Sequence, residues 1–284
     1  MFWMAVILTF SFNTFAQEDF NSIDMEITDS IYGAGDFRIP CQIEDTSQSC
    51  KIDTGAPFSI FSNLAPKSNI TLINQVNYTS VSGQSSTCQF LQSETSLLVG
   101  RNSIEQPAYF SCPNSNSNFL LGLNHLMKSA FTLDVKNKKF ISNSELNILD
   151  SSYNTDPSGH ILVEVEIIKS GVRKKIIAML DTGASVSVIN KDLILENPDF
   201  FTLINGTFEG LKDTLDNSLQ NTLAMVNGIQ IDQKRIAAPY AVAIDFKSMN
   251  EEIGFRVDMI IGANVIKEMN SISINPLNQT WSAD

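Results

Sequence analysis

The sequence predicts an all-β protein that consists of two similar lobes. Three observations support this prediction: Asp-Thr-Gly-Ala occurs at residues 53–56 and again at 181–184, a second apolar motif follows each copy, and no long stretch has the periodicity of an amphipathic helix. An Asp-Thr-Gly tripeptide arises by chance roughly once in several thousand positions. Two copies in matching apolar surroundings therefore indicate one carboxylate used twice.

The spacing of the motifs indicates an internal repeat. The two aspartates are 181 − 53 = 128 residues apart, close to half of the 284-residue chain. The second motif, residues 118–126 and 258–266, keeps two aliphatic residues, a glycine and an asparagine in register. A turn-rich stretch that ends on an aromatic residue follows in both halves, at 133–140 and 274–281. Because the three motifs keep their order, we expect duplicated lobes.

Composition places the boundary between the lobes. Residues 151–159 are polar and rich in serine, with one proline and one glycine, which is typical of a linker. We therefore expect an N-terminal lobe over residues 17–150 and a C-terminal lobe over 160–284. Each lobe is long enough to bury a modest core.

Apolar segments bounded by turn residues predict the strands in order. In the first half, residues 17–35 suggest an edge strand and a loop, and 76–88 suggest a mobile hairpin centred on glycine. In the second half, a hairpin through Gly171 leads to the second aspartate, and a short helix is expected after the glycine of each second motif. The other expected strands are 37–43, 50–53, 58–64, 97–99, 108–110, 119–126, 160–168, 176–180, 223–231, 240–244 and 256–266.

The first sixteen residues resemble a secretory signal. An apolar run is followed by small and polar residues and by a plausible cleavage site after Ala16, although no lysine or arginine precedes the run. A buried strand of the mature fold is the alternative. The run is shorter than the roughly 20 residues that span a bilayer, so no stable membrane span is expected. These features predict a secreted or periplasmic protein.

The net charge of −12 and the lack of a cluster of basic residues argue against binding to nucleic acid. Four cysteines, all in the first half, suggest disulfides behind a secretory signal. A bridge between Cys41 and Cys50 across a turn is the first expectation, which leaves Cys88 with Cys112. Four cysteines allow three connectivities, and buried thiols remain an alternative. The cysteine and histidine spacings do not suggest a metal site.

Two carboxylates that meet in a cleft define a specific chemistry. If the two Asp-Thr-Gly loops pack together, Asp53 and Asp181 repel as anions and share one proton. Such a pair can take a proton from a water that attacks a peptide carbonyl and give the other proton to the carbonyl oxygen. Gly55 and Gly183 allow the loops to approach. No metal, cofactor or covalent intermediate is required.

These motifs resemble those of the aspartic proteases. Each half is similar to a retropepsin domain, and the tandem resembles the two-lobed pepsins, over most of residues 36–284. The resemblance implies that Asp53 and Asp181 are the catalytic pair of an endopeptidase that acts on extended peptide or protein substrates. It also implies supporting roles for the loop residues Thr54, Gly55, Ala56, Thr182, Gly183 and Ala184, and for Gly122 and Gly262, which would pack behind the loops.

The resemblance also implies a flap, a hairpin that closes over the substrate. It maps to the region of Gly83 and to that of Gly210, with Tyr78 as the candidate for the flap tyrosine of pepsins. Pepsins have a serine or threonine where Ala56 and Ala184 stand. The loss of that hydroxyl donor predicts activity that is less confined to acid.

Other functions remain open at this point. A pepsin-like scaffold could bind peptides or proteins without cutting them, since a fold does not imply a function. Each half could also pair with its twin in another molecule, but the linked tandem favours a monomer with an intramolecular pseudo-dimer. The two histidines, His125 and His160, are expected to be structural.

Overall fold

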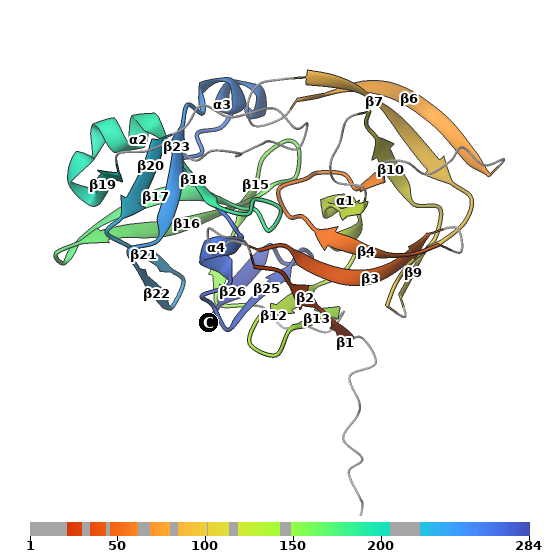
Figure 1. The fold of residues 1–284 in the computed structure, drawn as a ribbon, viewed down its shortest axis with the longest axis horizontal. Coiled ribbons are helices and arrows are strands. Elements are labelled where there is room, and N and C mark those ends of the chain that lie inside the picture. Colours follow the sequence, from red (N-terminus) through yellow and green to blue (C-terminus); the bar gives the residue numbers. More distant parts are fainter. Residues whose placement is uncertain are drawn as a thin grey trace, which may run out of the picture.

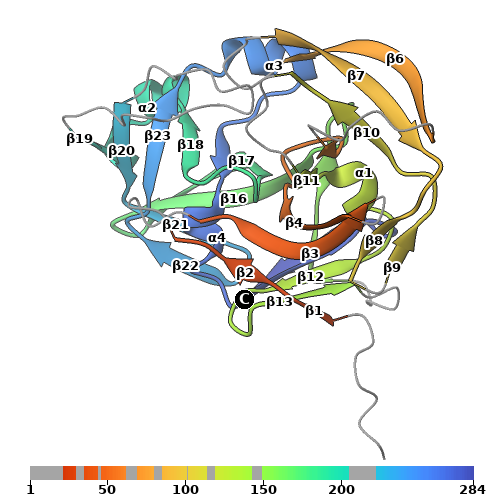
Figure 2. The same cartoon turned by 45° about the vertical axis from the view of Figure 1, so that its right-hand side comes forward.

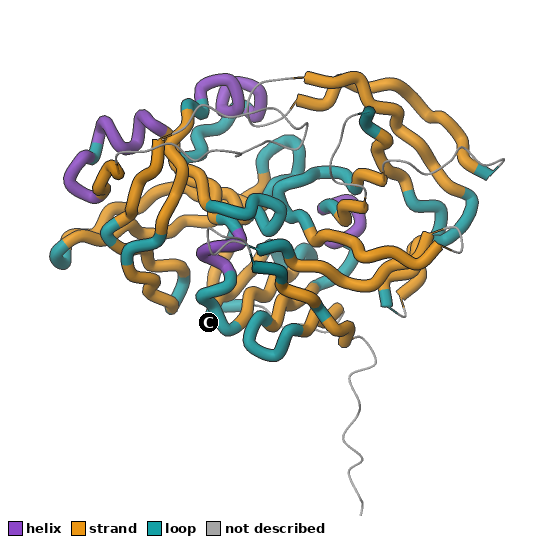
Figure 3. The backbone as a smooth tube through the Cα atoms, viewed as in Figure 1, coloured by secondary structure: helices purple, strands orange, loops and turns teal. Residues whose placement is uncertain are grey.

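The structure is a computed structural model, and it describes residues 22–29, 35–43, 46–61, 69–79, 85–100, 102–113, 119–142, 149–204 and 222–284. Strands dominate these ranges, and the few helices are short (Figure 3). The all-β prediction is therefore confirmed. The strands form two large curled sheets, one from each half of the chain, and a third sheet to which both halves contribute (Figure 1).

The first large sheet forms the N-terminal lobe. Its strand order is β6-β7-β10-β5-β11-β4-β3-β8-β9, and β2 pairs with β3. Hydrophobic residues alternate with polar ones along β3, so that one face of this strand is buried and the other is partly exposed. The strands are β2 (Glu26–Ile27), β3 (Phe37–Ile43), β4 (Thr46–Ile52), β5 (Ile60–Phe61), β6 (Ile70–Thr79), β7 (Ser85–Ser93), β8 (Leu97–Val99), β9 (Asn102–Ile104), β10 (Ala108–Ser111) and β11 (Phe119–Leu121).

The second large sheet has the same strand order. It runs β19-β20-β23-β18-β24-β17-β16-β21-β22, with β15 on β16, so each strand has a counterpart in the first lobe. The strands are β15 (Asn154–Thr155), β16 (Ile161–Lys169), β17 (Val172–Leu180), β18 (Ser187–Asn190), β19 (Phe201–Ile204), β20 (Thr222–Val226), β21 (Gly228–Ile231), β22 (Lys234–Ala237), β23 (Tyr240–Ile244) and β24 (Met259–Ile261).

A six-stranded sheet joins the two halves. Its order is β1-β13-β12-β25-β26-β14, and the antiparallel pair β12 and β25 connects the lobes (Figure 1). The turn-rich stretches at 133–140 and 274–281 lie in the hairpins β12–β13 and β25–β26 on either side of this junction. The strands are β1 (Ser22–Asp24), β12 (Phe131–Asp134), β13 (Lys139–Ser142), β14 (Ser151–Ser152), β25 (Ser271–Asn275) and β26 (Thr280–Ala283).

The segment expected as a linker, residues 151–159, contains β14 and β15. The first pairs with β26 in the joining sheet, and the second pairs with β16 in the C-terminal lobe. Two-residue strands are too short to show an alternating pattern, so the polar composition did not reveal them. Of the expected strand at 58–64, residues 58–61 are described, and of these only Ile60–Phe61 form a strand, β5. The expected strand at 223–231 is divided into β20 and β21.

The helices are short. As predicted, α1 (Leu123–Leu126) and α4 (Ala263–Ile266) follow the glycines of the second motif. Three further elements were not expected from the sequence, because segments of three to seven residues are too short to show helical periodicity: α2 (Lys191–Glu196), α3 (Lys247–Ile253) and the 3₁₀ turn η1 (Pro198–Phe200). No helix in the described ranges is long and apolar enough to cross a membrane.

Two disulfides brace the N-terminal lobe. Cys41 bonds to Cys50 across the β3–β4 hairpin, with Cα atoms 5.8 Å apart, and Cys88 on β7 bonds to Cys112, just after β10, with Cα atoms 4.4 Å apart. Both separations suit a disulfide. The first of the three possible connectivities is therefore the one that the structure has.

Candidate active site

Asp53 and Asp181 each follow the end of a central strand. The backbone N–H of Asp53, after β4, donates to the carbonyl of Leu121, and that of Asp181, after β17, donates to the carbonyl of Ile261, both at 3.0 Å. Each aspartate is thus fixed to the neighbouring strand, β11 or β24, at the point where its own strand ends. The two loops that begin here meet between the lobes.

The two threonines bond reciprocally across the boundary between the lobes. The Oγ1 of Thr54 accepts the N–H of Thr182 at 3.0 Å and donates to the carbonyl of Leu180 at 2.8 Å. The Oγ1 of Thr182 accepts the N–H of Thr54 at 3.1 Å and donates to the carbonyl of Ile52 at 2.8 Å. Both threonines are buried. These four bonds hold the two loops in a defined mutual position.

The glycine of each loop lies against the carboxyl group of the other lobe. A Cβ atom at Gly55 would overlap the side chain of Asp181, and one at Gly183 would overlap that of Asp53. Such an overlap leaves no room for any residue larger than glycine at either position. The loops therefore approach so closely that each carboxyl group covers the opposite glycine.

The glycines of the second motif pack behind these loops. A Cβ atom at Gly122 would lie within 2.5–2.8 Å of the backbone of Ala56 and Phe58, and one at Gly262 would lie within 2.7–2.9 Å of backbone atoms after Asp181. The N–H of Leu123 donates to Ala56 at 2.9 Å, and the equivalent bond in the second lobe, to Ala184, measures 2.8 Å. Each glycine thus lies directly against the backbone of the aspartate loop in its own lobe.

A serine and an asparagine in each lobe complete this support. The Oγ of Ser59 accepts the N–H of Gly122 at 2.8 Å, and the Oδ1 of Asn124 accepts from the backbone and hydroxyl of Ser59. Ser187 and Asn264 repeat these bonds in the second lobe, where Ser187 accepts from Gly262 at 2.9 Å. No role for these residues was expected from the sequence. The signal was present, because each serine follows its aspartate by six residues.

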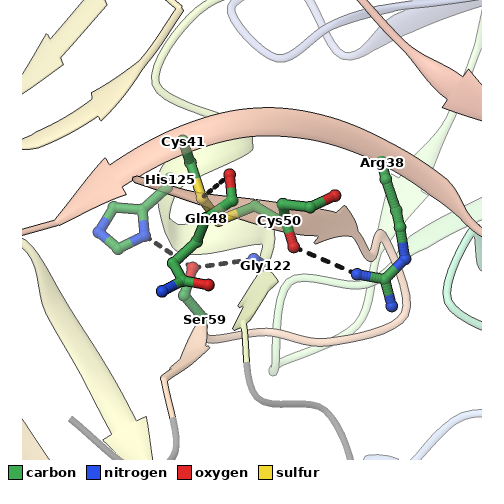
Figure 4. Close-up of a disulfide and its surroundings, with 8 residues drawn as sticks. Arg38, Cys41, Gln48, Cys50, Ser59, Gly122 and His125 are labelled. Atoms are coloured by element: carbon green, nitrogen blue, oxygen red, sulfur yellow. Dashed lines mark hydrogen bonds between the residues drawn. A yellow bond between two sulfur atoms is a disulfide. The ribbon is translucent and has the colours of Figure 1, made fainter. Parts of the chain in front are cut away.

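His125 extends the network in the first lobe only. Its Nδ1 lies 2.7 Å from the hydroxyl of Ser59, close to the disulfide of the β3–β4 hairpin (Figure 4), and its ring stacks on Phe61. Burial, together with the charge of Lys128, lowers the pKa of His125 to about 4. His160 bonds to Asp156 at 2.6 Å. Both histidines thus have partners of their own.

The electrostatics of the two carboxyl groups differ from those of free aspartates. Burial raises the pKa of Asp53, and the charge of Asp181 and a hydrogen bond with it raise that pKa further, to about 7 from an ordinary value of 3.8. The positive charge of Lys51 and the N–H of Gly55 act in the opposite direction. Asp53 therefore retains a proton at a pH at which an exposed aspartate is ionised.

The hydrogen bonds divide the roles between the two carboxyl groups. Among the described residues, Asp181 accepts two backbone N–H groups, from Gly183 at 2.8 Å and Ala184 at 3.0 Å, whereas Asp53 accepts one, from Gly55 at 2.9 Å. Hydrogen bonds from N–H groups stabilise a charged carboxylate. Asp53 thus has fewer such bonds than Asp181 to stabilise its charged form, which agrees with the raised pKa of Asp53.

The flap residues are described only in part. Tyr78 lies on β6, where its backbone is paired with Ser86 of β7. The β6–β7 hairpin extends toward α3 of the other lobe in both views (Figures 1 and 2). Gly83 and Gly210 lie outside the described residues.

The comparisons with known proteins add no relative. The sequence matches no protein-family model and no curated protein. In the part of the chain that the structure describes, no three His, Cys, Asp or Glu side chains gather as they would around a metal ion. The function is therefore inferred from the geometry of the two aspartate loops.

Proposed function

We propose that the chain is an aspartic endopeptidase in which Asp53 and Asp181 activate a water molecule for attack on a peptide bond. The observation that carries this proposal is the mutual arrangement of the loops, in which each glycine lies under the carboxyl group of the other lobe. This contact places two carboxyl groups side by side, and one of them has a pKa raised to about 7. A raised pKa beside an anionic partner is what acid and base catalysis requires.

The two aspartates have distinct parts in this mechanism. The carboxylate of Asp181 accepts a proton from the water as its oxygen bonds to the carbonyl carbon, and Asp53 gives its proton to the carbonyl oxygen. The tetrahedral diol then collapses: Asp181 gives the proton that it took from water to the nitrogen, the C–N bond breaks, and one hydroxyl group returns a proton to Asp53 as the carbonyl group of a new carboxylic acid forms. The hydrogen bonds of Thr54 and Thr182 keep the two carboxyl groups aligned during these proton transfers.

The two lobes support an origin by duplication. The large sheets have the same strand order, and the Asp, Thr, Gly and Ser of the site occur at the same offsets in both halves. The residues of both loops come from one chain, which fits a monomer with an intramolecular pseudo-dimer. Two disulfides and the apolar N-terminal run fit a secreted or periplasmic location.

The test is cleavage of a diverse peptide mixture between about pH 3 and 8, with products identified by mass spectrometry. Asp53→Asn and Asp181→Asn keep the shape of the site but remove one carboxyl group each, so both are expected to abolish cleavage. Asp199→Asn, which changes a side chain that is 91% exposed, is the matched control and is expected to cut like the parent.

Two results would count against the proposal. Cleavage by either site variant at the parental rate would show that another group performs the reaction. A folded parent that binds peptides but cuts none at any pH would instead favour the silent pepsin-like scaffold.

A further inference from the structure

A lysine occupies the position two residues before Asp53. Side chains alternate between the faces of a strand, so Lys51 and Asp53 point to the same face, about 7 Å apart along the chain. Ile52 between them is fully buried on the opposite face. The side chain of Lys51 is itself only 14% exposed, so its charge is poorly screened by water.

The position of this lysine is fixed by an ion pair. Its Nζ lies 2.8 Å from the Oδ1 of Asp36, and the other oxygen of Asp36 lies 3.2 Å from a guanidinium nitrogen of Arg38. Arg38 also donates to the carbonyl of Ser49 at 3.1 Å (Figure 4). Two cations share one carboxylate, so this cluster of Asp36, Arg38 and Lys51 has a net charge of +1.

The second lobe has no such charge at the equivalent place. The strand registers define one row of residues across each large sheet, on the face that carries the aspartate. In the first lobe the row is Arg38, Lys51, Leu120, Ile60, Phe110 and Phe90. In the second lobe it is Leu162, Met179, Ile260, Val188, Val242 and Leu223. The cations therefore stand beside Asp53 alone.

We propose that Lys51, oriented by Asp36, is a positioning residue that holds a positive charge on the Asp53 side of the site and so limits activity at the high-pH end. This inference rests on the proposed function. A cation close to a carboxyl group favours its ionised form, and Lys51 indeed opposes the rise in the pKa of Asp53. The proton that Asp53 must donate is thus lost at a lower pH than it would be without Lys51.

The charged groups around this lysine come from few elements. Asp36 precedes β3, and Arg38 lies on β3 opposite Lys51, with Glu26 of β2 in register beyond it. On the other side, β11 presents Leu120, which carries no charge. The loop from the second lobe contributes Asp181, next to Asp53. Asp36 is therefore the only described anion that bonds directly to Lys51.

The test uses two variants of the same ion pair. Lys51→Met introduces the residue that the second lobe has at the equivalent position, Met179, and so removes the cation. We expect the high-pH limb of kcat/KM to move to higher pH by about 0.5–1.5 units. Asp36→Asn leaves Lys51 and Arg38 without their anion, and is expected to move the limb downward. Lys51→Arg keeps the charge and is expected to leave the limb close to that of the parent.

A matched control is the ion pair of Lys175 and Glu164 at 2.6 Å. Lys175 lies six residues before Asp181 on an extended strand, about 20 Å away along the chain. Lys175→Met and Glu164→Gln are expected to leave the pH profile unchanged. If Lys51 had only a structural role, Lys51→Met and Asp36→Asn would lower activity or stability but would not move the high-pH limb of kcat/KM in opposite directions.

A second readout does not depend on cleavage. Titration of ¹³C-labelled aspartate carboxyl groups by NMR, in the full chain and in each variant, reports the protonation of Asp53 directly. Shifts of the Asp53 titration in opposite directions in Lys51→Met and Asp36→Asn would support the role of Lys51. This holds even if the parent cuts no peptide, because that result would count against the proposed endopeptidase function only. Shifts in the same direction, no shifts, or equal shifts in the controls would overturn the role of Lys51.

Discussion

The hydroxyl oxygens of Thr54 and Thr182 each accept a hydrogen bond from the backbone N–H of the other threonine, across the boundary between the lobes. The distances from nitrogen to Oγ1 are 3.0 and 3.1 Å. Each hydroxyl also donates to a carbonyl of the opposite strand, so it accepts and donates at once. The four bonds of the two threonines therefore join the two loops directly across the boundary between the lobes. The geometry of the two carboxyl groups therefore depends on both hydroxyls.

Thr182→Val is expected to destabilise the protein. Valine has the shape of threonine but leaves the N–H of Thr54 and the carbonyl of Ile52 buried without partners, at a cost of roughly 2–6 kcal/mol in unfolding free energy. Thr182→Ser keeps the hydroxyl and loses only a methyl group, which costs about 1 kcal/mol. Urea unfolding of the parent and both variants measures the difference. Equal losses for valine and serine would contradict the bonding role.

Gly183→Ala is expected to displace the carboxyl group of Asp53 and to leave the strands of the two large sheets in place. The new methyl group would overlap the carboxyl group of Asp53, and a displacement of about 1 Å in a catalytic group can lower a rate roughly 100-fold. Gly228→Ala is the control, because its Cβ would meet only ordinary contacts, at 3.4 Å or more. Peptide cleavage rates compare the two, and similar rates would argue against close approach of the loops.

Asp53 is expected to make stability fall as pH rises. Its pKa is about 7 in the folded chain and about 3.8 when exposed, so between these values the folded state holds a proton that the unfolded state has lost. The stabilising contribution is complete below about pH 4 and is lost toward pH 7, at up to roughly 1.4 kcal/mol per pH unit. Asp53→Asn removes this contribution, so the stability of the variant relative to that of the parent rises from pH 4 to 7. Unfolding measured from pH 4 to 7 in both proteins checks the sign.

His125 is expected to have the opposite effect. Its pKa is lowered to about 4 from 6.5, so the unfolded chain binds a proton that the folded chain rejects, and stability is lost as pH falls from about 6.5 toward 4. His125→Val, which introduces the residue found at position 265 of the second lobe, removes this dependence. In the parent the two opposite effects nearly cancel, so its free energy of unfolding changes little between pH 4 and 6.5. That of His125→Val falls with rising pH because only the effect of Asp53 remains, and that of Asp53→Asn rises because only the effect of His125 remains. Unfolding measured across this range checks both slopes.

The sequence indicated more about the site than about the elements around it. The repeated Asp-Thr-Gly loops and the glycines at 122 and 262 could be located because a fixed spacing recurs in both halves. The helices α2 and α3 and the short strands β14 and β15 could not, because segments of two to seven residues are too short to show a period. The roles of Ser59 and Ser187 required the position of a backbone N–H group more than sixty residues further along the chain.

The sequence by itself determined that two aspartate loops of the same kind exist, in lobes of the same β-rich type, because each motif is local and occurs twice. Only the tertiary structure decided that the loops meet, that the threonines bond reciprocally, and that Asp36 holds the largely buried side chain of Lys51 in an ion pair. Burial and neighbouring charges act through space, so a symmetric pair of motifs becomes an asymmetric pair of carboxyl groups only when the chain is folded.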